Sequence, residues 1–143
     1  MKNVVVDANV CLNWFLPTEH LNQTDYAQAF LAYIRDENVL VHVPAHFEME
    51  VSGTLLKVFR SRGRGFTEKS LNTALDIMDA MPLNVHGFVK GYAKITALAR
   101  AYNLSMYDTP YMNLARALDC PIATRDRGLI SAAKAWRVEV WQA

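Results

Sequence analysis

The chain opens with Asn3-Val4-Val5-Val6-Asp7, a short β-branched run that stops at a carboxylate. An apolar run without alternation is typical of a strand that is buried on both faces. A second run of this kind, over residues 39–43, stops at Pro44. The residues between the two runs carry the apolar spacing of a helix, so the pattern predicts two parallel strands joined by a crossover helix.

The same alternation continues to the end of the chain. We expect helices over residues 8–16, 23–35, 45–59, 71–81, 90–102, 109–118 and 128–135, and further strands over 83–85, 121–124 and 138–141. Strands that alternate with helices predict an α/β fold with a central, mainly parallel sheet and helices on both faces. At 143 residues, 1–143 is expected to form a single domain.

Composition narrows the class of protein. The chain is 52% hydrophobic and 20% charged, with a formal net charge of +1 and two cysteines. The low net charge indicates no strongly basic surface, although a local basic patch can still bind nucleic acid, and two cysteines are too few for a disulfide framework. No leader peptide and no apolar stretch of membrane-spanning length is evident. We therefore expect a soluble, cytoplasmic protein that does not associate with a membrane.

Four carboxylates fall where a parallel sheet binds ligands. Asp7 directly follows the first predicted strand, and Asp126 comes two residues after the strand over 121–124. Asp108 and Glu50 stand at the starts of helices that follow loops at the same edge. Because ligands bind outside the carboxyl ends of such strands, these four side chains are predicted to converge.

A cluster of carboxylates has a particular chemistry. Carboxylates in one crevice repel each other, and desolvation raises their pKa values, so a cation normally stabilises the cluster. Ligands that are all oxygen favour Mg²⁺ or Mn²⁺ over zinc. Such a metal lowers the pKa of a bound water and offsets charge on a leaving oxygen, which suits phosphodiester hydrolysis.

Each acid also has a purely structural interpretation. Asp7 and Asp108 could cap helices, Asp126 could be a turn residue, and Glu50 could be a solvated helix residue. No single acid is specific. Their shared position at one edge of the predicted sheet favours the functional interpretation.

Four segments of the chain, in order and spacing, resemble the PIN-domain nucleases, and in particular the VapC toxins. The first is VVVDANV over residues 4–10, and the second has VP at 43–44, EV at 50–51 and Leu55. The third has LSMYDTPY over 104–111 and LA at 114–115, and the fourth is CPIATRDRGL over 120–129. Together they span almost the whole chain.

The resemblance implies a three-layer α/β/α sandwich and an Mg²⁺- or Mn²⁺-dependent endoribonuclease that cleaves single-stranded or loop RNA. It implies a toxin that is held in check by a small antitoxin protein, and we also expect a homodimer. The residues that match the family's four acids are Asp7, Glu50, Asp108 and Asp126. Asn9 and Thr124 match positions of small polar side chains beside these ligands, where they would orient carboxylates or water. Alternatively, Asn9 is a helix-start residue and Thr124 a strand-end hydroxyl.

Two features depart from the family pattern. Gly53 stands where the family often has Asn, three residues after the glutamate. In addition, Glu48 falls within the apolar stripe of its predicted helix, whereas Glu50 lies at the flank. Periodicity therefore does not select Glu50, and its role as a ligand is a hypothesis that rests on the family spacing.

Basic and aromatic residues offer candidate RNA contacts. Arg62 belongs to a cluster of positive charges around a glycine-bearing turn, while Arg125 and Arg127 flank Asp126 and are favoured slightly. A solvated surface is the alternative for the Arg62 cluster. Tyr107 and Tyr111 could stack on bases, although core packing is the commoner use of such residues.

Two other functions stay open. The first is a non-catalytic PIN-like module that binds RNA or protein, which Gly53 and the low net charge favour and the four retained acids oppose. The second is a receiver-like or phosphatase-like domain that uses Asp7 as a phosphoacceptor.

Overall fold

The central sheet of the computed structural model has four strands, all parallel. The structure describes residues 1–16, 21–36, 38–61 and 65–143. The strands are β1 (Lys2–Val6), β2 (Val39–Pro44), β3 (Leu83–His86) and β4 (Ile122–Ala123), in the order β3-β2-β1-β4. Each adjacent pair is parallel, with Val4 opposite Val41 and Val5 opposite Ile122. The predicted parallel α/β fold is confirmed.

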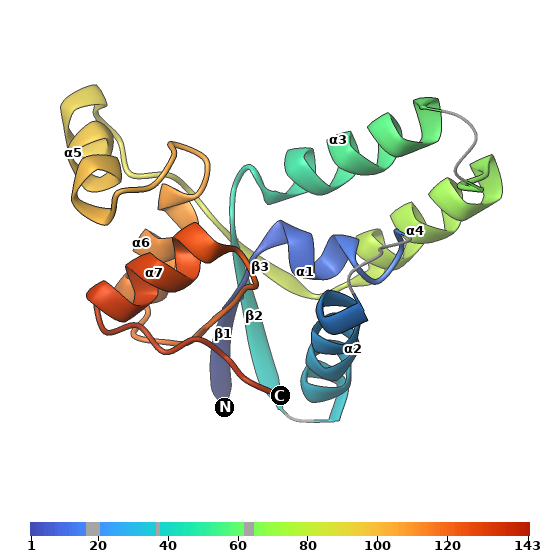
Figure 1. The fold of residues 1–143 in the computed structure, drawn as a ribbon, viewed down its shortest axis with the longest axis horizontal. Coiled ribbons are helices and arrows are strands. Elements are labelled where there is room, and N and C mark those ends of the chain that lie inside the picture. The colour runs from blue at the N-terminus through green and yellow to red at the C-terminus, as the bar shows by residue number, and fades with distance from the viewer. Residues whose placement is uncertain (17–20, 37, 62–64) are drawn as a thin grey trace.

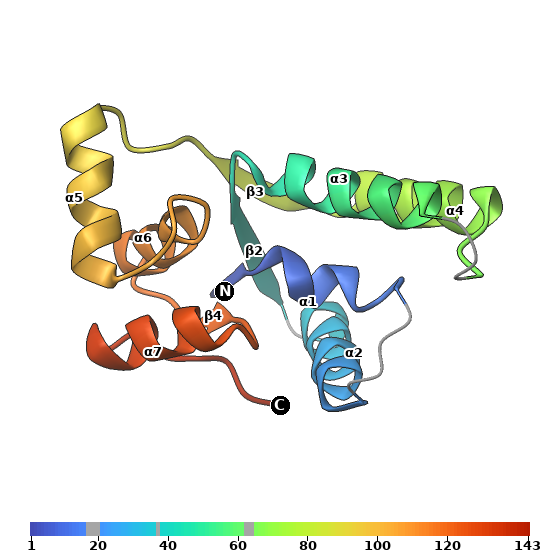
Figure 2. The ribbon, with the colours of Figure 1, turned by 45° about the horizontal axis from the view of Figure 1, so that its top comes forward.

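Helices cover both faces of this sheet. They are α1 (Ala8–Leu12), α2 (Leu21–Asp36), α3 (Phe47–Arg60), α4 (Glu68–Ala80), α5 (Tyr92–Tyr102), α6 (Thr109–Ala117) and α7 (Arg127–Ala135). Figure 2 shows α5, α6 and α7 on one side of the strands and α1 to α4 on the other. The three-layer sandwich is therefore present. No helix in the described ranges has both the length and the apolar character needed to cross a membrane.

The core forms where the helices meet the non-alternating strands. Val4, Val5 and Val6 are fully buried, as expected of a strand covered on both faces. Large side chains from the helices complete the core, among them Phe30, Phe47, Leu55, Tyr111, Met112 and Leu129. Burying one such side chain contributes roughly 1.5–3 kcal/mol. This packing fixes the strand ends that carry the candidate site.

The C-terminal strand is the clearest difference from the prediction. The expected strand over residues 138–141 is reduced to one parallel bridge between Ile122 and Val140. Its partner, β4, contains only two residues, because Pro121 has no N–H and the Thr124 N–H donates to the Tyr26 hydroxyl at 3.2 Å. A two-residue strand leaves little backbone for a further strand to pair with.

The carboxyl ends of the strands open on one edge of the sheet. There β1 leads into α1, β2 into α3, and β4 into α7, near the centre of Figure 1. The segment before α6 reaches the same region (Figure 1). Any ligand of this fold is expected at that edge.

Candidate active site

Asp7 is the most buried of the four candidate acids. It directly follows β1 and is 4% exposed, and its Oδ2 accepts a hydrogen bond of 2.9 Å from the Thr124 hydroxyl. Burial raises the pKa of Asp7 to about 7, the Thr124 hydrogen bond opposes this, and the charges of Asp108 and Asp126 raise it further. Although Asp7 is the N-cap residue of α1, its side chain makes no capping hydrogen bond to that helix. The backbone N–H of Asn9 in α1 does lower the pKa of this carboxylate, so the helix start contributes to its surroundings, while its side-chain hydrogen bond is to Thr124.

Asp126 is tied to Asp7 through Thr124. The backbone N–H of Asp126 donates to Thr124 Oγ1 at 3.0 Å, while the hydroxyl itself donates to Asp7. Asp126 Oδ2 accepts a hydrogen bond of 2.9 Å from the Leu129 N–H and so caps α7. The structural role of Asp126 is thus that of a helix cap and not that of the turn residue considered as its alternative, since one of its oxygens stabilises the start of α7.

Asp108 belongs to the same electrostatic group. It is the N-cap residue of α6, but its side chain makes no capping hydrogen bond. Partial burial raises the pKa of Asp108, and the charges of Asp126 and Glu50 raise it further. A carboxylate whose pKa is raised by two other carboxylates lies within their electrostatic reach.

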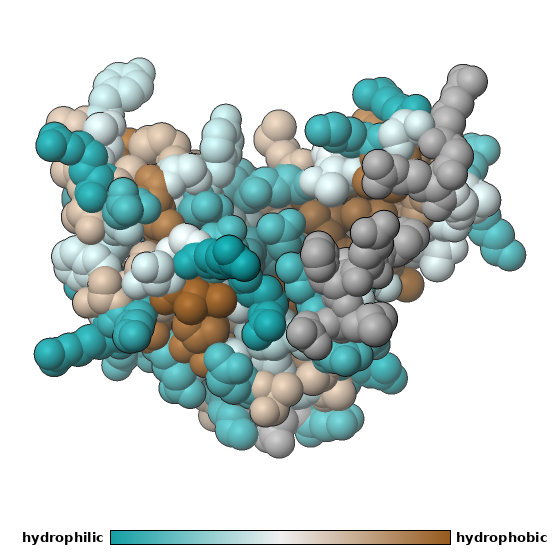
Figure 3. Space-filling view, viewed as in Figure 1, coloured by the Kyte–Doolittle hydropathy of each residue, from teal (hydrophilic) through white to brown (hydrophobic). Residues whose placement is uncertain are grey.

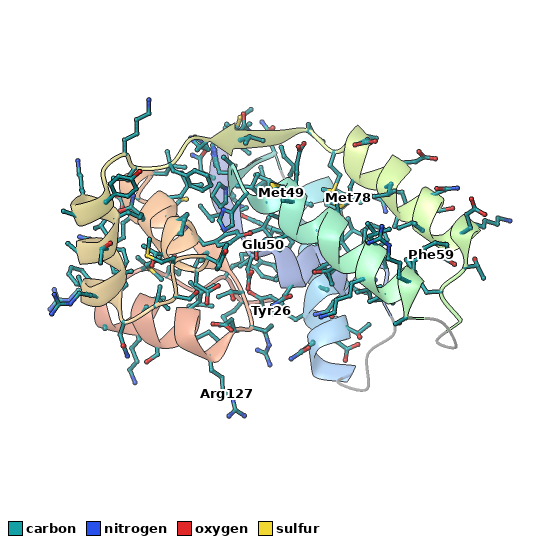
Figure 4. All side chains as sticks on the ribbon, turned by 90° about the horizontal axis from the view of Figure 1, so that it is seen from above. Tyr26, Met49, Glu50, Phe59, Met78 and Arg127 are labelled. Carbon is teal, nitrogen blue, oxygen red and sulfur yellow. The ribbon has the colours of Figure 1, made fainter. Side chains whose placement is uncertain are left out.

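Glu50 and Glu48 lie in different surroundings. Glu50 Oε1 accepts a hydrogen bond of 2.7 Å from the Tyr111 hydroxyl on α6, across the site. Figure 4 places Glu50 at the end of α3 that lies near the middle of the molecule. Glu48 is exposed and lines a groove with Met78 and Leu83 instead. The geometry therefore places Glu50 beside Tyr111 of α6 and Glu48 away from it, although helical periodicity did not select Glu50.

His46 is a site residue that the sequence prediction missed, and the contact of Tyr111 with Glu50 was not predicted either. His46 Nε2 lies 3.0 Å from Glu50 Oε1 and 2.7 Å from the carbonyl oxygen of Tyr107. It therefore joins the start of α3 to the loop that carries Asp108. The i,i+4 spacing of His46 and Glu50 could have indicated this pair. Tyr111 is fully buried, so its role is core packing and holding Glu50, not base stacking.

The predicted polar and basic contacts lie on one side of the acids. Asn9 is exposed and lines a hollow of about 470 Å³ together with Asp126, Arg125 and Arg127. The Arg125 guanidinium lies 5.2 Å from the centre of the Tyr26 ring, and Arg127 projects outward from α7 (Figure 4). Figure 3 shows hydrophilic side chains gathered over the middle of this face. Arg62 lies outside the described residues.

Gly53 leaves space where the family often has an amide. No described atom lies within 4 Å of a Cβ built on Gly53. The position is exposed, in the second turn of α3 and three residues after Glu50. The sequence departure therefore corresponds to an open position on α3.

The candidate ligand atoms are of the chemical type that a hard divalent cation prefers. They are carboxylate oxygens, one of them buried and held by a hydroxyl, and the charges of neighbouring carboxylates help to raise the pKa values of Asp7 and Asp108. Within the part of the chain that the structure describes, no three Asp, Glu, His or Cys side chains form a ready metal-binding group. Metal binding would therefore require side chains to move closer together.

Comparison with known proteins places this geometry in a family. The model of the PIN domain matches residues 4–135. The fold is similar to that of FitAcB from Neisseria gonorrhoeae, with a TM-score of 0.62 and 20% identity over 97% of this chain and 96% of that one. It is also similar to that of VapBC2 from Rickettsia felis, whose structure contains a DNA fragment from the VapBC2 promoter. For this pair the TM-score is 0.62, with 13% identity over 97% of both chains.

A third structure, of a protein from Pyrobaculum aerophilum, has a TM-score of 0.59 and 16% identity over 92% of this chain and 84% of that one. At these low sequence identities, the similarity to the three structures shows a shared fold. A comparison with curated proteins finds no match.

Proposed function

The chain belongs to the PIN-domain family, and from this premise we propose that it is an Mg²⁺- or Mn²⁺-dependent endoribonuclease. The observation that carries the proposal is the placement of Asp7. Asp7 is a buried carboxylate whose pKa is raised to about 7 beside two further aspartates. Such a group destabilises the fold and is typical of a functional site. The four family motifs of the sequence support the same activity.

The proposed roles follow from the contacts. Asp7, Asp108 and Asp126 would hold the cation together with Glu50, whose Oε1 accepts a hydrogen bond from the Tyr111 hydroxyl. Thr124 orients Asp7 and holds the backbone of Asp126 at the same time. When bound, the cation supplies a water of lowered pKa and stabilises charge on the leaving oxygen.

The hollow beside Asp126 suits the path of the RNA backbone. Its positive side chains, Arg125 and Arg127, stand directly next to the carboxylate in the sequence. With a net charge of only +1, attraction of phosphates has to be local. We propose that these two arginines bind phosphates that flank the scissile bond.

We further propose that the protein is the toxin of a toxin–antitoxin pair, with a small antitoxin protein and a second copy of the chain as partners. The resemblance of the motifs to VapC toxins and the fold shared with FitAcB and VapBC2 support this. Co-expression with the protein encoded beside it should relieve growth arrest caused by the wild-type chain. An Asp7→Asn chain should cause no arrest.

A non-catalytic PIN-like module is the second candidate. Among the residues that the structure describes, the acids do not form a ready metal-binding group, and this favours it. Its prediction differs clearly from that of the nuclease, because such a module binds its target and leaves it intact whether or not metal is present.

Cleavage of end-labelled structured RNAs tests the proposal. Purified protein is incubated with Mn²⁺, with Mg²⁺ and with EDTA, beside Asp7→Asn and Asp108→Asn. We expect cutting that needs metal and that both substitutions abolish, because each removes a charged ligand. The exposed Asp76→Asn on α4 is the matched control and should cut normally. Cutting that survives both site substitutions, or that persists in EDTA, would contradict the proposal. Binding of RNA without cutting would favour the module.

A further inference from the structure

Aromatic rings gather beside Glu50 and Asp108. Tyr107 directly precedes Asp108, Phe88 lies between β3 and α5, and His46 directly precedes α3. The ring centroids of His46 and Phe88 are 5.3 Å apart, and those of His46 and Tyr107 are 6.2 Å apart. Tyr107 is 71% exposed and Phe88 is 49% exposed. We call His46, Phe88 and Tyr107 the aromatic platform.

His46 fixes this platform relative to the carboxylates. Its Nε2 lies 2.7 Å from the Tyr107 carbonyl oxygen and 3.0 Å from Glu50 Oε1, so one ring touches both elements. Its Nδ1 is buried and has no hydrogen-bond partner among the described residues. The imidazole therefore lies between the start of α3 and the loop that carries Asp108, and its contacts hold the exposed rings beside the acids.

Part of the platform borders open space. Phe88 forms one wall of a hollow of about 300 Å³ between the segment after β3 and helix α6, lined mostly by apolar residues such as Pro44, Ile95 and Leu114. Two large rings left exposed in this way do not contribute fully to the core. Tyr111 provides the contrast, because its ring is fully buried and its hydroxyl is bonded to Glu50.

We propose that the aromatic platform binds an unpaired nucleobase of the RNA, next to the nucleotide whose phosphate reaches the carboxylates. This inference rests on the proposed function. Every base has a π-face that stacks on an aromatic side chain, whereas a base inside a duplex has both faces covered. The platform therefore selects single-stranded segments without reading their sequence.

The position of the rings favours a nucleotide over a protein partner. Exposed aromatic residues also occur at protein interfaces. Here, however, Tyr107 is the immediate neighbour of Asp108, and His46 contacts Glu50, so a base on the platform brings its own phosphate to the acids. A protein partner bound at this place is the outcome that the experiment has to exclude.

The test uses binding of a single-stranded ribo-oligonucleotide that carries 2-aminopurine, whose fluorescence reports stacking. All proteins carry Asp7→Asn, so that the RNA stays intact. Phe88→Leu and Tyr107→Leu remove the rings, while Phe88→Tyr and Tyr107→Phe keep them. Tyr92→Leu removes a ring that is 95% exposed at the start of α5 and serves as the matched control. Circular dichroism verifies the folded state of each protein, and the two ring positions test the proposal independently.

We expect each leucine variant to weaken binding roughly 5-fold to 100-fold and to lose the fluorescence change. The variants that keep a ring, and Tyr92→Leu, should bind like the parent protein, and a duplex of the same sequence should bind more weakly. Unchanged binding by both leucine variants, or an equal loss in Tyr92→Leu, would overturn the inference.

The two proposals fail separately. If wild-type protein cuts RNA and the leucine variants, in the Asp7→Asn background, bind the oligonucleotide normally, the platform is wrong and the nuclease stands. If no RNA is cut but the leucine variants lose oligonucleotide binding, the platform stands and the nuclease is wrong.

Discussion

Burial acts more strongly on Asp7 than on the other three carboxylates of the site. Its pKa of about 7 in the folded protein lies well above the ordinary value of 3.8. The folded state therefore holds this proton more tightly than the unfolded state does. Between about pH 4 and pH 7, each rise in pH therefore lowers the contribution of Asp7 to the free energy of unfolding. Above about pH 7 this loss is complete.

Asp7→Asn should therefore stabilise the metal-free protein at pH 8 and have a much smaller effect near pH 4. The upper bound of the gain is about 4 kcal/mol, since one pKa unit corresponds to about 1.4 kcal/mol. Urea unfolding in EDTA at a series of pH values measures it, with Asp76→Asn on α4 as the control for loss of an exposed charge. A gain that does not grow from pH 4 to pH 8 would show that Asp7 is not strained by burial.

The two glutamates of α3 provide a matched pair. Glu50 contacts Tyr111 at the site, whereas Glu48 lines the groove toward α4. Glu50→Gln should weaken Mn²⁺ binding roughly 10-fold or more, because a charged oxygen ligand is lost. Glu48→Gln should bind like wild type in the same calorimetric titration. Loss of binding in Glu48→Gln alone would reverse the assignment.

At the scale of whole elements, the sequence predicts most of the fold. The β-branched run over residues 3–6 and the apolar run at 39–43 become β1 and β2 with ends shifted by one residue, because burial on both faces shows directly in composition. The strand expected at 138–141 is reduced to a single parallel bridge with Ile122, since its pairing depends on how far β4 extends. That extent is set by the Tyr26 hydroxyl, a contact 98 positions away in the chain.

The candidate site divides in the same way. The positions of the four acids along the fold could be predicted, because Asp7 and Asp126 come after strands and Glu50 and Asp108 stand at the starts of helices. Their role as metal ligands stays a prediction. The contacts of Glu50 with His46 and Tyr111 could not be predicted, because they depend on the rotation of α3 relative to α6. Periodicity placed Glu48 within the apolar stripe and Glu50 at its flank, and only the packing of α3 shows that Glu48 faces α4 and β3 while Glu50 faces Tyr111.

Thr124 joins β4 to the start of α7 and both to Asp7. Thr124→Val keeps the shape but removes the donor to Asp7 and the acceptor for the Asp126 N–H. We expect a loss of roughly 1–3 kcal/mol in the free energy of unfolding and a roughly 10- to 100-fold weaker affinity for Mn²⁺. Thr124→Ser keeps the hydroxyl and should restore most of the affinity. Equal metal binding by the valine and serine variants would show that the hydroxyl is not needed.

The molecule as a whole carries almost no net charge, so its attraction for RNA has to come from local groups. Arg125→Gln and Arg127→Gln should each weaken RNA binding and lower the slope of log K against log salt by about 1. Arg100→Gln, at an exposed position near the end of α5, should leave the slope unchanged. Filter binding at several salt concentrations measures this, and unchanged slopes in both site variants would place the RNA path elsewhere.

Location of Mn²⁺ by anomalous diffraction from soaked crystals tests the central claim most directly. The carboxylates that end β1, follow β4 and begin α3 and α6 are proposed to form one cation site. The predicted result is a peak within coordination distance of Asp7 and of at least one of Asp108 and Asp126. A peak beside Glu48, or no peak at the acids at an Mn²⁺ concentration that supports cleavage, would contradict it.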